Sequence, residues 1–118
     1  MTEMFRSDGG GLSRPDTGTL VARAADQTDW QVSAPGFLVK PLYEDAGSNQ
    51  RTWLMKVEPG AYSPPHAHEE LEQFLVIEGQ FSDGEVTYGP GDFAIRAPGA
   101  IHEASSESGA LVVLFYSS

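Results

Sequence analysis

Short apolar runs, separated by turns rich in glycine and proline, follow one another along most of the chain. Residues 36–43 and 52–57 have strand composition and flank a polar loop, which predicts a hairpin. Residues 71–77 are almost continuously apolar after Gln73, which is typical of a strand buried on both faces. Further short strands are predicted at residues 19–23, 29–32, 81–84, 85–88, 92–96 and 110–116.

No window of useful length has helical periodicity, so the pattern predicts an all-β protein. A small jelly-roll barrel is the natural closure, because it protects strand edges and leaves an interior able to hold a site. We expect a single domain over residues 19–118, preceded by a flexible tail at residues 1–18, where three consecutive glycines interrupt any pattern. The predicted core residues are Phe74, Val76, Phe93, Ile95, Val113 and Phe115.

The net charge of the chain limits the classes of partner that it is expected to bind. Seven basic and 17 acidic residues give a formal net charge of −10, which repels phosphate backbones and anionic lipid surfaces, so we expect neither a nucleic-acid nor a membrane partner. The chain has no cysteine, which excludes disulfides and thiolate ligands. The N-terminus has no apolar run behind basic residues, so we expect a cytoplasmic protein without a signal peptide.

Two of the three histidines lie close together in the sequence. His66 and His68 are two residues apart, so in an extended chain they project from the same face and can reach one cation. Glu72 follows shortly after, and His102 comes after a second glycine-bounded strand that can return it to the same place. Three nitrogens and one carboxylate oxygen suit a single divalent ion, and this donor set leaves Fe, Zn, Mn, Ni and Co open.

The spacing of these residues resembles the first motif of the cupins, which reads glycine, five residues, His-x-His, three residues, glutamate, six residues, glycine. The positions that match are Gly60, His66, His68, Glu72 and Gly79. The second motif is matched by Gly91, Gly99 and His102. It departs at Ala97, where proline is usual, and at Ser106, where asparagine is usual. Neither position is a metal ligand in the cupins, so these departures concern the turn more than the site.

Within the cupins, one group is most similar. Residues 78–83, together with Tyr88, Gly91 and the pair Pro98 and Gly99, look most like the cupin domain of ChrR-type anti-sigma factors. The resemblance covers about residues 36–117. It implies a small double-stranded β-helix and a metal ion bound by the ligand positions His66, His68, Glu72 and His102.

Other interpretations of these side chains compete with the metal site. The histidines could be ordinary hydrogen-bonded strand residues, but all three fall on ligand positions of a spaced motif. Glu69 and Glu70 could belong to a solvated acidic loop, and Glu70 would need an unbroken strand to serve as the ligand. Candidates for the pocket wall, each of which could equally be an exposed strand residue, are Tyr62, Trp53, Met55, Gln73 and Arg96.

Two functions follow from the resemblance. The first is a small metal-dependent enzyme of dioxygenase type, in which Glu72 is both ligand and proton acceptor for a small oxygenated substrate. The second is a sensory module like the ChrR cupin domain, without catalysis. The chain offers neither length nor cysteines for the separate zinc domain of those anti-sigma factors, so we expect a free-standing protein. Apolar residues near Leu20 and Trp30 suggest a homodimer paired through strand edges.

Overall fold

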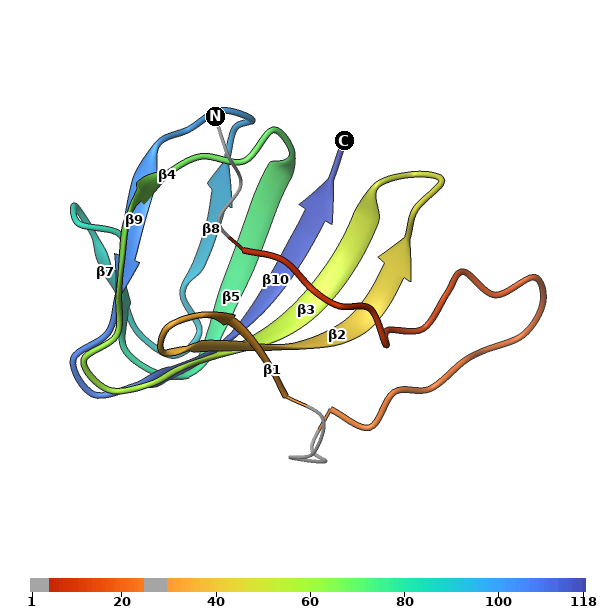
Figure 1. The fold of residues 1–118 in the computed structure, drawn as a ribbon, viewed down its shortest axis with the longest axis horizontal. Helices are drawn as coiled ribbons and strands as arrows, with labels where there is room; N and C mark the ends of the chain where they lie inside the picture. The colour runs from red at the N-terminus through yellow and green to blue at the C-terminus, as the bar shows by residue number, and fades with distance from the viewer. Residues whose placement is uncertain (1–4, 25–29) are drawn as a thin grey trace.

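The computed structural model describes residues 5–24 and 30–118. All of the regular structure in these residues is β, and none of them is helical. In the part of the chain that is described, no helix has the length and apolar character needed to cross a membrane. Figure 1 shows two sheets that face each other across one interior, which confirms the predicted all-β jelly-roll barrel, the small double-stranded β-helix.

The larger sheet has six strands in the order β1-β2-β3-β10-β5-β8. Their bounds are β1 Gln31–Ala34, β2 Phe37–Asp45, β3 Gln50–Val57, β10 Ala110–Ser117, β5 Leu71–Gly79 and β8 Phe93–Arg96. All neighbouring pairs are antiparallel. The predicted hairpin is formed by β2 and β3, and the closing strand β10 lies between β3 and β5.

The smaller sheet has four strands in the order β4-β9-β6-β7. Their bounds are β4 Tyr62–His66, β9 His102–Ser105, β6 Phe81–Ser82 and β7 Thr87–Tyr88. Because β4 pairs antiparallel with β9, His66 and His102 lie directly opposite each other across the ladder. The two segments that carry the sequence motifs are thereby brought together.

One glycine permits the close approach of β5 and the turn before β10. Gly79 has φ of 81°, a conformation that side chains other than glycine rarely adopt. A Cβ atom there would collide with the Gly109 carbonyl and lie 2.7 Å from the Cα atom of Ala110. Gln80 donates a backbone hydrogen bond to the same carbonyl at 3.0 Å, so any other residue at position 79 would disrupt this junction.

The core lies between the sheets, and the prediction of its residues was correct only in part. Phe74 and Val76 are buried, as expected. Phe93 and Ile95 are 55% and 58% exposed, Phe115 is also exposed, and Val113 is only half-buried, so these four predictions were wrong. The core positions that replace them on β10 are Val112, Leu114 and Tyr116.

Strand register explains the error. Phe74 pairs with Ala94 and Leu114, whereas Leu75 pairs with Phe93 and Val113. Directly opposed residues share a sheet face, so the second group lies on the outer face. Leu75 and Ile77 are exposed there, which also corrects the expectation that residues 71–77 form a strand buried on both faces.

The N-terminal residues differ from the expected pattern. Residues 19–23 are exposed and form no strand, so that prediction was wrong. The predicted flexible tail includes residues 1–4, which lie outside the described residues, and residue 29 of the predicted strand at 29–32 does so as well. Residues 5–12 lie along β1 and β2, where Leu12 forms a parallel bridge with Tyr43 and exchanges hydrogen bonds with the backbone of Leu42 and Glu44.

Candidate metal centre

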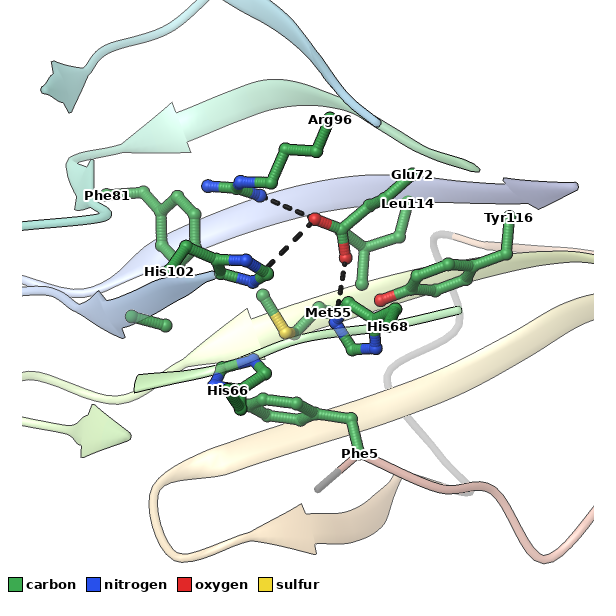
Figure 2. A pocket seen from close by; sticks show the side chains of 11 residues that line it. Phe5, Met55, His66, His68, Glu72, Phe81, Arg96, His102, Leu114 and Tyr116 are labelled. Atoms are coloured by element: carbon green, nitrogen blue, oxygen red, sulfur yellow. Dashed lines mark hydrogen bonds and ion pairs between the residues drawn. The ribbon is translucent and has the colours of Figure 1, made fainter. Parts of the chain in front are cut away.

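The three histidines converge inside the barrel from three places in the chain. His66 ends β4, His68 follows in the loop before β5, and His102 begins β9. One ring nitrogen from each lies within 4.8 Å of the others. His66 and His68 are buried and His102 is half-buried, so the cluster faces the interior rather than the solvent (Figure 2).

Backbone carbonyls orient two of the imidazoles. His66 Nδ1 lies 2.8 Å from the Pro64 carbonyl oxygen, and His102 Nδ1 lies 3.4 Å from the Ala100 carbonyl oxygen. A carbonyl can only accept a hydrogen bond, so each contact favours the proton on Nδ1 and leaves Nε2 with its lone pair. Metal-binding histidines commonly use their second nitrogen in this way.

Glu72 is the carboxylate beside the histidines. It enters from β5, is buried, and places Oε2 3.3 Å from His68 Nε2 and Oε1 3.9 Å from His102 Nε2. The competing acidic residues lie elsewhere: Glu69 is exposed and Glu70 pairs with Arg51 at 2.5 Å. The structure therefore brings Glu72, and neither neighbour, to the three imidazoles.

Arg96 holds the opposite side of this carboxylate. Its Nη1 lies 2.5 Å from Glu72 Oε1, its Nη2 lies 3.2 Å from Asp83 Oδ2, and its guanidinium stacks 4.7 Å from the Phe74 ring. Asp83 also accepts a hydrogen bond of 2.6 Å from the Tyr88 hydroxyl. A continuous polar network thus runs from Tyr88 to Glu72.

The charge states suit cation binding. Burial lowers the pKa of His66, and burial followed by the nearby Arg96 charge lowers the pKa of His102 to about 4, so both are neutral at pH 7. Burial opposes ionisation of Glu72, but the Arg96 charge, then His68 and a hydrogen bond from Tyr116, together lower its pKa. Neutral imidazoles beside an ionised carboxylate are the protonation states that a divalent ion requires.

The cavity at this centre is small and largely apolar. Its volume is about 20 Å³, which is room for an ion and a water molecule but not for an organic substrate. Around the histidines, Glu72 and Arg96, it is lined by Phe5, Met55, Phe81, Ala104, Leu114 and Tyr116.

The predicted pocket wall was correct for two of its five residues. Met55 and Arg96 line the cavity. Tyr62 is exposed, and its hydroxyl donates a hydrogen bond of 2.7 Å to Glu103 Oε2. Gln73 pairs with Phe115 and Ile95 on the outer face of the large sheet. Trp53 is buried one layer behind the cavity, where it packs 5.5 Å from the ring of Tyr116, which in turn lies 5.3 Å from the ring of His68.

Five lining residues were not anticipated: Phe5, Phe81, Ala104, Leu114 and Tyr116. Tyr116 shares its strand parity with Leu114, so a correct choice of face for β10 would have identified it. The sequence did not indicate that Phe5 is buried, because residues 1–18 have no periodicity that could distinguish a packed side chain from an exposed one.

Comparison with known proteins agrees with this architecture. A family model described as the ChrR cupin-like domain matches residues 19–118. The chain is a ChrR-like cupin. Among curated proteins none matches it.

Solved structures with the same fold include two above 25% identity to this cupin. KdgF from Halomonas sp. is 28% identical, with a TM-score of 0.69 over 86% of this chain and 96% of that chain. The Rhodobacter sphaeroides complex of SigE with the anti-sigma ChrR is matched at 26% identity, with a TM-score of 0.67 over 81% of this chain and 52% of that chain. This cupin therefore spans about half the length of some of the structures that it matches.

A third structure shows likeness of fold alone. It is the acetylacetone dioxygenase from Acinetobacter johnsonii, which is 11% identical to this cupin, with a TM-score of 0.75 over 92% of this chain and 80% of that chain. The histidine cluster of this cupin could hold one metal ion, as the donor set and its protonation states fit a divalent cation.

Proposed function

We propose that His66, His68, Glu72 and His102 bind one divalent metal ion. The observation that supports this is the convergence of three imidazole nitrogens within 4.8 Å beside a buried, ionised carboxylate. When bound, such an ion supplies a Lewis acid and, if it is iron, a redox centre. Four protein ligands leave positions open to a small molecule when the ion is five- or six-coordinate.

Elemental analysis of the purified protein tests the metal, and we expect about one divalent ion per chain. Added ion should raise the melting temperature of the native protein, because a ligand at 100 times its Kd adds about 2.7 kcal/mol to the free energy of unfolding. His102→Ala should abolish this increase, whereas Glu70→Gln, which alters an acid paired with Arg51, should retain it. Absence of metal together with no thermal response to Fe, Mn, Ni, Co or Zn would contradict the proposal.

We further propose an enzyme of dioxygenase type that acts on a small oxygenated organic compound. Glu72 is the proton acceptor, because Arg96 engages Oε1 and leaves Oε2 directed toward His68. The apolar lining by Met55 and Leu114 favours an aromatic or enolisable carbonyl compound over a sugar phosphate, which would need several cationic side chains. The fold shared with an acetylacetone dioxygenase supports the reaction type by analogy.

Oxygen uptake measures this activity. The protein is loaded with Fe(II) anaerobically, mixed with a panel of diketones, catechols and flavonols, and exposed to oxygen. We expect turnover on at least one class, and its loss in Glu72→Gln and in His102→Ala. Glu70→Gln is the matched control, since its carboxylate pairs with Arg51 instead of contacting the histidines, and it should keep the activity.

A sensory role is the second candidate, and the match to the ChrR cupin-like family favours it. The ChrR chain that this cupin resembles is an anti-sigma protein crystallised with SigE, so a relative uses a protein partner. Full metal occupancy with no oxygen uptake on any panel member, combined with a conformational response to peroxide or an aldehyde, would replace the enzyme by this sensor.

We also propose that the chain forms a homodimer and is cytoplasmic. Support for the dimer comes from apolar side chains at the surface: Leu20 is exposed in the N-terminal segment, and Phe93 and Ile95 are exposed on the edge strand β8. A small-molecule ligand is the expected partner of the metal centre.

A further inference from the structure

The Phe5 ring closes the cavity of the candidate metal centre. Although it comes from the N-terminal segment, Phe5 is only 5% exposed. Its ring centroid lies 5.1 Å from the ring of His66, 6.5 Å from that of His68 and 5.2 Å from that of Phe37. Figure 2 shows the ring on the side of the histidines away from Glu72 and Arg96. The phenyl group thus fills the space that would otherwise extend the cavity.

Phe5 differs from the other apolar side chains that line the cavity. Met55, Phe81, Ala104, Leu114 and Tyr116 all belong to strands of the two sheets, where backbone ladders hold them in place. Phe5 lies outside the named strands. Moving a strand residue would break the sheet, whereas moving Phe5 would not.

The segment that carries Phe5 is held near the cavity by two side chains of β1. Ser33 Oγ accepts a hydrogen bond from the Arg6 amide and donates one to the Arg6 carbonyl, both at 2.9 Å. Gln31 accepts one from the Asp8 amide at 2.7 Å and donates one to the Gly9 carbonyl at 2.5 Å. The bonds to Arg6 and Asp8 are exposed to solvent, and such bonds open at low free-energy cost.

Glycines follow directly and give the backbone conformational freedom at this point. Gly9 and Gly10 have φ of 93° and 101°, and a Cβ atom at Gly9 would meet nothing within 4 Å. Residues 5–8 can therefore swing about this point while Leu12 stays bonded to β2.

We propose that Phe5 is a displaceable plug, and that the small-molecule ligand of this centre enters by replacing the phenyl ring with a flat apolar group of similar size. The ligand class rests on the proposed function, because it assumes that a small molecule binds at the metal. The cavity of about 20 Å³ is too small for such a molecule while Phe5 is in place. Phe37 and the two imidazoles that contact the phenyl ring would then contact the ligand.

The first experiment tests the plug without any metal. Diethyl pyrocarbonate modifies accessible imidazoles, and mass spectrometry gives the rate for each histidine of the metal-free protein. Phe5→Ala should raise the rate at His66, which contacts the phenyl ring, on the order of tenfold. Phe93→Ala is the matched control, because Phe93 lies exposed on the outer face, and it should leave the rate unchanged.

A second variant keeps the test decisive if Phe5→Ala folds poorly. The double substitution Gln31→Ala with Ser33→Ala removes the hydrogen bonds that these two β1 side chains make to residues 6–9, whereas the 3.3 Å bond from Ser7 Oγ to Glu44 Oε1 remains. It leaves every cavity-lining side chain intact. It should also accelerate modification of His66. Native rates at His66 in both Phe5→Ala and the double variant would overturn the plug.

The second experiment tests the ligand, with the Co(II)-loaded protein and two hydroxamates as probes. Benzohydroxamate carries one flat ring and acetohydroxamate only a methyl group. In the native protein, benzohydroxamate should increase amide hydrogen exchange at Arg6 and Asp8, and acetohydroxamate should not. Phe5→Ala should bind benzohydroxamate more tightly, on the order of tenfold, because no plug has to be displaced.

The two proposals fail in different ways. If the protein binds neither Co(II) nor Fe, Mn, Ni or Zn, the metal site is wrong, and the histidine modification rates still decide whether Phe5 is a plug. If Co(II) binds and benzohydroxamate gives equal affinities in native and Phe5→Ala protein without a change in amide exchange, the displacement of Phe5 is wrong and the metal site stands.

Discussion

Among the described residues that line the metal-site cavity, only Arg96 carries a guanidinium, and this group contacts two carboxylates at once. Arg96→Gln would leave Glu72 as a buried charge without its main counter-ion. We expect a loss of about 3 kcal/mol in the free energy of unfolding of the metal-free protein. The loss should be smaller with bound Zn(II), because the ion takes over neutralisation of Glu72.

Urea unfolding with and without Zn(II) measures both values. Glu70→Gln is the control, since it breaks a comparable 2.5 Å pair with Arg51 that lies outside the cavity and leaves the Arg51 side chain over the Tyr116 ring. Its cost should not depend on the ion. An equal loss for Arg96→Gln in both conditions would show that Arg96 matters for packing over Phe74 instead of for the charge of Glu72.

Asp83 gives the protein an acid-sensitive contribution to stability. Burial opposes its ionisation, but hydrogen bonds from Tyr88, from the Val86 and Glu85 amides and from Arg96 lower its pKa from 3.8 to about 2. The unfolded chain therefore takes up this proton first. The contribution is present above pH 3.8 and is lost as the pH falls through about 2.

Asp83→Asn cannot take up this proton. The difference in unfolding free energy between native protein and Asp83→Asn should therefore shrink as the pH falls from about 5 to about 2.5. Urea titrations across this range measure it. A difference that stays constant with pH would show that the Asp83 carboxylate has an ordinary pKa.

Strands β5, β8 and β10 show which features of the fold could be predicted from the sequence and which could not. The barrel could be predicted from its turns, and the motif spacing predicted the convergence of the three histidines, which strand pairing brings about. That His66, His68, Glu72 and His102 bind a metal stays a prediction. Which face of β10 points inward could not be predicted. Leu111 to Tyr116 are apolar at every position, so the pattern is the same whichever alternate set of residues faces the core. The burial of Phe5 could not be predicted either, since a single aromatic residue without periodic neighbours does not indicate whether it is packed or exposed.

The two faces of the large sheet should respond differently to substitution. Phe74→Ala removes a fully buried ring between the sheets and should cost about 3 to 5 kcal/mol. In the monomer, Phe93→Ser alters an exposed ring on the neighbouring strand and should change stability by less than about 0.5 kcal/mol. Urea unfolding of the two variants compares them. Similar costs would mean that the outer face is covered in solution.

Across the molecule as a whole, apolar side chains are exposed both in the N-terminal segment and on the outer face of the large sheet. We expect light scattering at micromolar concentration to give about twice the chain mass of 12.7 kDa. Two variants distinguish the interfaces: Leu20→Ser with Val21→Ser alters the N-terminal segment, and Phe93→Ser with Ile95→Ser alters the outer sheet face. The double variant that is a monomer identifies the surface that forms the dimer interface. A native protein that is already a monomer would rule out the dimer.

The edge-to-face contacts of Trp53 with Tyr116, and of Tyr116 with His68, have an optical consequence. The buried indole lies one aromatic ring away from the candidate metal ligands, within range for energy transfer to a coloured or paramagnetic ion. Co(II), Ni(II) or Fe(II) in the centre should dim Trp53 emission, whereas colourless Zn(II) should leave it bright. Since the chain has two tryptophans, Trp30→Phe isolates this signal. Trp53 emission should thus distinguish Zn(II) from a coloured or paramagnetic ion in this centre.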